Sequence, residues 1–303
     1  MAVTLYRSSD GSAPGAYNNT AGSLIAILDG CLVNGYGAKA AAGWTKAYSG
    51  TNKAAYRNST TAPSTGFYLR IDDTSTSESR AVGYESMSDV DTGTDAFPTG
   101  AQVSGGLYLQ KSASTAAWML IADSRAFYFF YKYAGAAKWW GFYFGDFVSR
   151  VASDPYCCAI VGRINSGTSG NNEDFPRASN NLLTATQGHY LARNHSGTVK
   201  SVNFVKLAFF VNTFLGTGGF LYPNPADSNF IMDRCLVTDD TTNYNLRGYM
   251  PGLWNPLHSD PASDADTFSG NGDLSGRSYL IVANVNTSSA GKSVIETSDT
   301  WRT

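Results

Sequence analysis

Charged side chains are scarce in this sequence, and neither sign is in clear excess. Only 15% of the residues are charged, with 22 Lys and Arg against 24 Asp and Glu, whereas an average globular domain carries roughly 25%. A nucleic-acid groove needs clustered Lys and Arg to neutralise phosphates, and the sequence has no basic stripe. The balance therefore argues against a nucleic-acid partner, and equally against a protein held on a membrane surface by its charge.

Long apolar runs are also missing. No run approaches the roughly 20 residues that a transmembrane helix needs. The segment Met1–Thr4 lacks the basic and apolar regions of a signal peptide. We therefore expect a soluble chain with no membrane partner, which is not exported by the ordinary secretory route.

Cysteine and histidine are few and poorly placed for metal or redox chemistry. No two cysteines have the C-x-x-C spacing of a zinc ribbon or a thioredoxin-type site, and the pair His189 and His195 does not match H-E-x-x-H. Without an export signal, we expect four buried free thiols, the adjacent two pointing to opposite faces of a strand. The cysteines are Cys31, Cys157, Cys158 and Cys235.

Two Asp-rich segments invite a calcium interpretation, but neither has the full pattern. Asp89–Asp95 begins like an EF-hand loop, yet Thr94 stands where the loop needs Gly, and Gly100 where it needs a bidentate Glu. Asp260–Asp273 also lacks the pattern. Solvated turns are the better interpretation of both segments, and a structural cation near them is left open.

No catalytic constellation stands out. The sequence contains no G-x-S-x-G, and Ser289–Lys292 fits S-x-x-K without its companion motifs. Glu85 and Glu296 draw attention only because Glu occurs four times in the chain, and a hydrogen-bonding role is favoured for each. The segment Gly270–Gly276 misses the dinucleotide-binding spacing by one residue. We predict no catalytic residues, no cofactor, no metal site and no enzymatic activity.

Aromatic residues and turn-forming residues are what the chain has in plenty. Tyr, Phe and Trp make up 13% of the sequence, and 31 residues are Gly. Interface cores are enriched in aromatic residues and depleted in Lys, Glu and Asp, and a mostly helical protein would carry more Glu. The composition indicates a β-rich protein with much surface covered by other chains, or a β-rich enzyme that is poor in charge.

The fold class that we predict is mainly β, with antiparallel sandwich or barrel-like sheets and one N-terminal amphipathic helix at about 21–33. In that helix the apolar residues recur at helical spacing. Asn19 or Thr20 could cap its N-terminus, and the pair Asn34-Gly35 should end it. The apolar stripe consists of Leu24, Ile27, Leu28, Cys31 and Leu32.

Short apolar or alternating runs, separated by Gly, Ser, Asn or Asp, predict the strands. They are Gly66–Ile71, Arg80–Glu85, Gly106–Gln110, Ala117–Ala122, Arg125–Tyr133, Trp139–Phe144, Tyr156–Val161, Val199–Val211, Asn229–Thr238, Ser278–Ala283 and Lys292–Glu296. The run Phe127–Tyr131 is aromatic on both faces, so we expect core on one side of it and a partner surface or a helix on the other.

The organisation that we expect has three parts, which could also form one continuous domain. Residues 1–60 hold the N-terminal loop, helix and connecting segment, 61–165 a first β region and 166–303 a second. Asn165–Asn181 is the longest turn-like region and the candidate boundary, and Ser259–Gly276 is also rich in loops. No repeat of 20 to 50 residues and no sustained heptads occur, which excludes solenoids, propellers and coiled coils.

The residues that we single out are candidates for packing or for an interface. Trp139 and Trp140 could stack on sugar rings, but on a strand one of the two must face inward, so packing is preferred. The full set is Phe127, Phe129, Tyr131, Trp139, Trp140 and Trp254.

A set of segments, in order and spacing, resembles a family of uncharacterised virion structural proteins of tailed bacteriophages. The segments are Leu28–Gly37, Gly43–Thr45, Ser49–Arg57, Gly141–Asp146, Arg247–Trp254, Pro256–His258, Glu296–Ser298 and Thr300–Trp301. The resemblance implies a place in the virion, synthesis in the host bacterial cytoplasm, and partners that are other virion proteins and copies of the chain itself. It brings no functional residues to carry over.

Three functions follow as hypotheses. The first is a structural subunit of the virion, in the tail, baseplate or neck, with capsid decoration as the alternative place. The second is a glycan-binding or depolymerase module of a tail fibre that contacts the host surface, which would need an aromatic-lined groove and a carboxylate. The third is a cellular β-rich hydrolase, for which no nucleophile or carboxylate pair is found.

Overall fold

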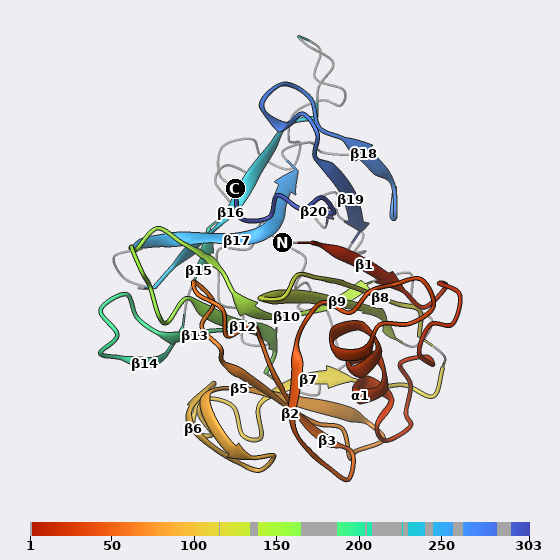
Figure 1. Cartoon of the computed structure of the whole chain (residues 1–303), viewed down its shortest axis with the longest axis vertical. Helices are drawn as coiled ribbons and strands as arrows, with labels where there is room; N and C mark the ends of the chain where they lie inside the picture. Colours follow the sequence, from red (N-terminus) through yellow and green to blue (C-terminus); the bar gives the residue numbers. More distant parts are fainter. Residues whose placement is uncertain are drawn as a thin grey trace.

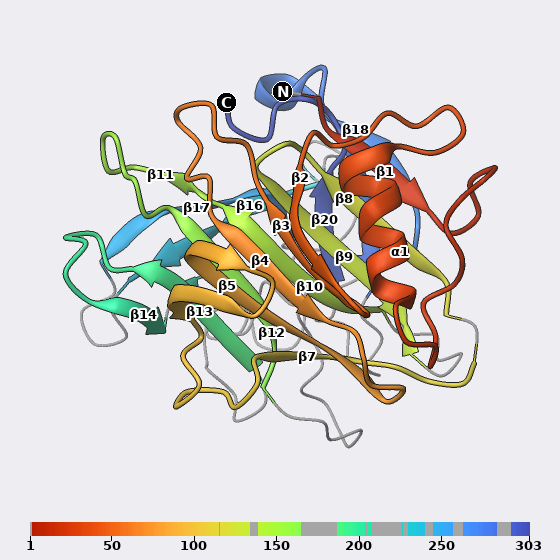
Figure 2. The same ribbon diagram turned by 60° about the horizontal axis from the view of Figure 1, so that its bottom comes forward.

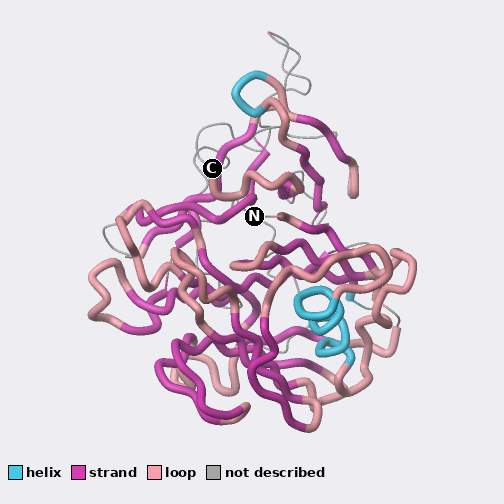
Figure 3. Tube along the Cα trace, viewed as in Figure 1, coloured by secondary structure: helices cyan, strands magenta, loops and turns pink. Residues whose placement is uncertain are grey.

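Two antiparallel sheets that curl into a half-barrel make up most of the fold, with 50% of the residues in strands and 7% helical (Figures 1 and 3). This confirms the predicted fold class. The computed structural model describes residues 2–114, 116–133, 139–164, 187–203, 205–207, 226, 230–239, 245–256, 263–283 and 292–303. Within these ranges, no helix is long and apolar enough to span a membrane.

The first sheet has 13 strands, and its main path runs β1-β8-β9-β10-β12-β7-β5-β4-β3-β2. Off this path, β13 pairs with β12 and β14, and β6 pairs with β5. The strands are β1 (Thr4–Arg7), β2 (Thr45–Gly50), β3 (Lys53–Arg57), β4 (Tyr68–Asp72), β5 (Glu78–Asp89), β6 (Thr92–Phe97), β7 (Leu107–Gln110), β8 (Trp118–Ala122), β9 (Ala126–Lys132), β10 (Trp139–Asp146), β12 (Cys158–Arg163), β13 (Gln187–Arg193) and β14 (Lys200–Asn203).

The second sheet has seven strands in the order β15-β16-β17-β20-β19-β18, and β11 pairs with β17. Its strands are β11 (Val148–Ser149), β15 (Val205–Leu207), β16 (Met232–Thr238), β17 (Leu246–Pro256), β18 (Thr267–Ser269), β19 (Ser278–Ala283) and β20 (Lys292–Glu296). Since β11 follows β10 after the single buried residue Phe147, the chain passes from the first sheet to the second at that residue.

The expected helix is present as α1 (Ser23–Leu28), which continues as a π-helical segment, η1 (Asp29–Asn34). It lies across the face of the first sheet (Figure 2). Gly35, with φ +74°, ends it as predicted. The predicted cap is wrong: Gly22 occupies the N-cap position, and the carboxylate of Asp73 accepts the backbone N–H of Leu24 at 2.8 Å instead. A residue distant in sequence thus does the work of a local cap.

Strand β9 separates two hydrophobic cores. Phe127, Phe129 and Tyr131 face the core that contains α1, whereas Tyr128 and Phe130 face the core shared with the second sheet. One covering element is therefore a helix, as expected, but the other is the chain's own second sheet rather than a partner. Tyr128 also donates a hydrogen bond to the carbonyl of Pro251 in β17 at 2.8 Å.

Strand prediction succeeds for most of the apolar runs and fails for several shorter or more polar strands and for β17. The bounds of β19 and β20 are as predicted. β17 is missed because it contains Gly248, Pro251 and Gly252, which are poor strand residues. β1, β2, β3, β6, β11, β13 and β18 are also missed, the last within the loop-rich region 259–276. The proposed boundary at 165–181 lies outside the described residues, and the domain limits stay predictions.

Candidate functional site

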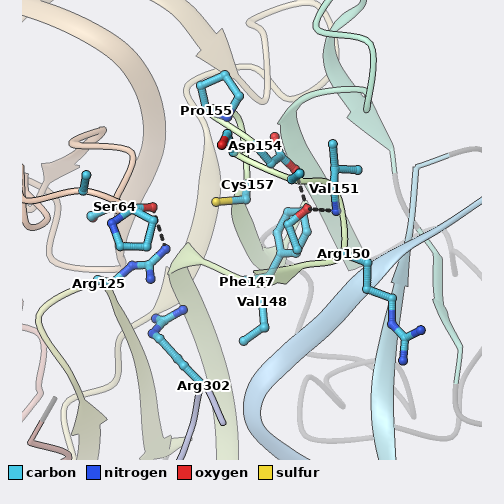
Figure 4. A pocket seen from close by; sticks show the side chains of 15 residues that line it. Ser64, Arg125, Phe147, Val148, Arg150, Val151, Asp154, Pro155, Cys157 and Arg302 are labelled. Atoms are coloured by element: carbon cyan, nitrogen blue, oxygen red, sulfur yellow. Dashed lines mark hydrogen bonds between the residues drawn. The ribbon is translucent and has the colours of Figure 1, made fainter.

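A cleft of about 570 Å³ opens where the chain passes between the sheets (Figure 4). Its size lies within the roughly 300 to 1,000 Å³ that is typical of small-molecule sites. Four segments line it: a loop before β4, the β8–β9 turn, the stretch from the end of β10 through the turn after β11, and the segment after β20. The lining residues are Ala62, Pro63, Ser64, Arg125, Phe147, Val148, Ser149, Arg150, Val151, Ala152, Ser153, Asp154, Pro155, Cys157 and Arg302.

The loop wall of the cleft is fixed by the buried carboxylate of Asp146, at the end of β10. It accepts hydrogen bonds from Thr65 Oγ1 at 2.6 Å, Asn58 Nδ2 at 2.9 Å and Ser64 Oγ at 3.0 Å. The backbone N–H of Thr65 and Nε of Arg125 also donate to it. This saturated carboxylate holds the loop against the sheet, so it is a structural group.

Two arginines lie next to each other on one side of the cleft. Arg125 Nη2 donates to the carbonyl of Pro63 at 2.9 Å. Arg302 Nε and Nη2 donate to Asp123 at 2.8 and 3.2 Å, and its Nη1 donates to the carbonyl of Asp146 at 3.0 Å. Arg302, which follows the second sheet, is thereby fastened to the β8–β9 turn of the first sheet. Burial alone would lower the pKa of Arg302, but the carboxylate of Asp123 outweighs it and raises that pKa above its ordinary value.

The turn wall is held by a second buried ion pair. Arg247 Nη2 and Nε donate to the two oxygens of Asp154 at 2.9 and 3.0 Å, and Ser149 Oγ donates to Asp154 at 2.7 Å. Burial raises the pKa of Asp154, but the hydrogen bonds from Arg247 and Ser149 outweigh it and hold that pKa below its usual value. The carboxylate is therefore ionised at neutral pH, and it already accepts hydrogen bonds from Arg247 and Ser149.

Cys157 also lines the cleft, and its thiol is a poor nucleophile. Burial, with the charges of Asp146 and Asp154 adding to it, raises the pKa of Cys157 to about 12. Because the thiolate is the reactive form, a thiol with such a pKa is inert at neutral pH. All four cysteines are buried and free, as predicted, and the adjacent Cys157 and Cys158 face different cores.

A smaller pocket of about 250 Å³ contains a His–Asp pair. His195 Nδ1 lies 2.7 Å from Oδ2 of Asp239, whose side chain is buried while that of His195 is half-exposed. The described residues that line this pocket include no Ser, Thr or Cys, so they offer no nucleophile for the pair to activate. The sequence did not reveal this pair, because nothing in it links residue 195 to residue 239. His189 is buried, and His258 lies outside the described residues.

The six aromatic residues singled out from the sequence line neither the cleft nor the His195 pocket. All six are buried within the chain, on β9, β10 and β17. The preference for packing at Trp139 and Trp140 is confirmed, and both are buried because they pack into the two different cores. Trp139 also donates Nε1 to Asp264 at 2.8 Å.

The two glutamates are engaged in hydrogen bonds, as favoured from the sequence. The buried carboxylate of Glu296 accepts from Trp254 Nε1 and Arg277 Nη1, both at 3.2 Å. Glu85 accepts Nε and Nη2 of Arg193 at 2.6 and 2.7 Å.

In the Asp-rich segment 89–95, Asp91 pairs with Lys53 and Arg70 at the β5–β6 hairpin. The predicted solvated turn is present at residues 90–91, with Asp89 and Asp91 exposed, whereas residues 92–97 form a strand. In the described part of the chain, no group of three or more His, Cys, Asp or Glu could hold a metal ion.

The cleft was not visible in the sequence because its walls come from residues near 63, 125, 150 and 302. In comparisons with known proteins, no family model and no curated protein matches the chain.

Proposed function

We propose that the chain is a structural subunit of a tailed bacteriophage virion, located in the tail, baseplate or neck, which acts by assembling with other virion proteins and with copies of itself. The resemblance of segments such as Ser49–Arg57 and Arg247–Trp254 to virion structural proteins motivates the proposal.

The observation that supports a scaffold role is the use of buried charge. Arg302 and Asp123 join segments 179 residues apart, and Arg247 and Asp154 join segments 93 residues apart. A buried charge costs free energy unless it is paired, and paired in this way it fixes the relative position of the elements. These side chains hold the two sheets together, which suits a particle component whose shape must persist.

The aromatic residues take a different role in this proposal from the one that composition suggested. Since the six named residues are buried inside the chain, contacts with neighbours must come from exposed residues and from sheet edges. β2 and β18 lie at the ends of the two strand paths and are largely exposed, so they offer free backbone groups for pairing with another chain.

Mass spectrometry of purified particles tests the proposal. We expect the chain in the particle at a fixed ratio to the major proteins, and in the tail fraction after heads and tails are separated. Recovery in the head fraction would favour capsid decoration. Absence from the particle would overturn the proposal.

The glycan-binding alternative has its own test. Incubation of the intact chain with a glycan array and with host polysaccharide should give neither binding nor cleavage. Among the described residues that line the cleft, one is aromatic, Phe147, and one carries a carboxylate, Asp154, which is already bound to Arg247.

A further inference from the structure

We propose that the cleft between the two sheets is a binding site for a ligand with one carboxylate beside an apolar group, and that Arg125 and Arg302 donate to that carboxylate. The inference does not rest on a virion role, because it follows from the donors, charges and apolar walls of the cleft.

Each of the two arginines has N–H groups that donate to no acceptor among the described residues. A guanidinium has five N–H groups. Arg125 uses one for Asp146 and one for Pro63, which leaves three. Arg302 uses two for Asp123 and one for the carbonyl of Asp146, which leaves two. In Figure 4 the two guanidinium groups lie next to each other at the cleft. Adjacent like charges with free donors favour an anion that accepts from both.

The net charge of the cleft lining indicates how many negative charges that anion should carry. In the described lining of the cleft, three residues are cationic, Arg125, Arg150 and Arg302, and one is anionic, Asp154. The charges of Asp146 and Asp123 offset those of Arg125 and Arg302, and Arg247 offsets Asp154. Arg150 is exposed, and the structure gives it no ion pair within the described residues. The excess is one positive charge, which suits a monoanion better than a phosphate with two.

The rest of the described lining is mainly apolar, with three serines among it, and it suits a ligand that carries hydrophobic surface beside its carboxylate. Pro63 stands on the loop wall, Phe147 and Val148 at the passage between sheets, and Val151 and Pro155 on the turn. Exposed Val151 gains from being covered. A carboxylate bonded to a carbon that carries an aliphatic group fits both the arginine side and the apolar side of the cleft. Such a group occurs in a small organic acid and in the C-terminal residue of a peptide.

The donors are positioned before any ligand arrives. Arg302 is held by Asp123 and by the backbone of β10, and Arg125 by Asp146 and by the loop carbonyl. Groups that are already fixed lose little conformational entropy on binding, which favours affinity.

Isothermal titration calorimetry on the intact chain tests the site with N-acetyl-leucine, its neutral analogue N-acetyl-leucinamide, and inorganic phosphate. We expect the acid to bind with a Kd below about 1 mM and the amide at least about tenfold more weakly, since it loses charge-assisted hydrogen bonds. Equal binding of acid and amide, no binding of the acid, or phosphate binding as tightly as the acid would each overturn the proposal.

A pair of peptides distinguishes the two sources of the carboxylate. A pentapeptide ending in leucine is titrated with a free and with an amidated C-terminus. Tighter binding of the free peptide than of N-acetyl-leucine supports the proposal with a chain end as the ligand. Weaker binding than N-acetyl-leucine supports it with a small acid.

Variants at the exposed residue Ala152 locate the site without disturbing the buried pairs. Ala152→Glu places a carboxylate at the cleft and should weaken the binding of N-acetyl-leucine by more than about tenfold. Ala152→Gln, which is isosteric with Ala152→Glu but neutral, should bind N-acetyl-leucine within about twofold of the parent. Arg150→Gln should lower the affinity for N-acetyl-leucine by about two- to fivefold, because the charge of Arg150 acts through solvent. Lys53→Gln, at the start of β3 and outside the cleft lining, should leave that affinity unchanged. Unaltered binding by Ala152→Glu, with the parent's melting temperature, would contradict the assignment.

Discussion

Two neighbouring ion-pair clusters differ in how much water reaches them. The pair Arg247 and Asp154 has side chains that are 0% and 3% exposed, whereas Lys200 and Asp95 are 51% and 26% exposed. Arg193 belongs to the second cluster, through Glu85 and Asp95, and its carbonyl accepts a hydrogen bond from Arg247. The comparison indicates that ion pairs with similar contact distances differ in energy, because solvent screens the pair Lys200–Asp95 and not the pair Arg247–Asp154.

The largest effect should come from breaking the buried pair. Arg247→Met leaves the carboxylate of Asp154 buried without its cation, and we expect a loss of about 3 to 5 kcal/mol in the free energy of unfolding. Urea denaturation measures it. The double variant Arg247→Met/Asp154→Leu should recover most of the loss. If the double variant were as unstable as the single one, uncompensated charge would not be the cause.

A buried aromatic residue gives an uncharged reference for that comparison. Phe129 is fully buried in the core beside α1, so Phe129→Ala should also cost about 3 to 5 kcal/mol, by transfer and cavity formation. Neither the Phe129 loss nor the Arg247 loss should depend on ionic strength, because solvent reaches neither site. Only the Arg247 loss should be recovered by a second substitution at its partner. A loss below about 1 kcal/mol would show that the core collapses around the gap.

Acid should weaken the buried pair selectively. The folded-state pKa of Asp154 lies below its usual value, so its contribution is present above the unfolded pKa of about 4 and is lost as the pH falls through the lower folded value. Urea midpoints between about pH 5 and pH 2 should fall less steeply in Arg247→Met/Asp154→Leu than in the parent. Parallel curves would contradict a lowered pKa at this residue.

The smallest effect should come from the exposed cluster. Lys200→Gln removes an ion pair with Asp95 that solvent already screens, and we expect less than about 1 kcal/mol. That difference should vanish at about 1 M salt, where the screening length falls to roughly 3 Å. A loss above about 1 kcal/mol that persists at about 1 M salt would show that solvent does not screen the pair Lys200–Asp95.

The sequence predicted what local patterns determine. The spacing of Leu24, Ile27 and Leu28 indicated the helix, and the uninterrupted run 278–283 marked β19, because apolar periodicity reports which face is buried. The cap on α1 was misassigned because Asp73, about 50 residues away, displaced the local candidates.

The cleft and the His195–Asp239 pair depend on long-range packing. Arg125 and Arg302 are ordinary surface-type residues in sequence, and only the docking of the second sheet on the first brings them to one cavity. The cover of the aromatic strand escaped prediction for the same reason. A sequence shows that Tyr128 and Phe130 must be buried, but not which segment buries them.

The fastening of Arg302 to Asp123 has a consequence for how the chain is made. On the ribosome, the β8–β9 turn emerges well before residue 302, and the face of β9 with Tyr128 and Phe130 emerges before the strands that shelter it. During that interval an apolar sheet face is open to water, and such a surface attracts other nascent chains. We therefore expect truncation before residue 292, which removes β20 and Arg302, to yield a chaperone-bound or insoluble product rather than a smaller folded unit.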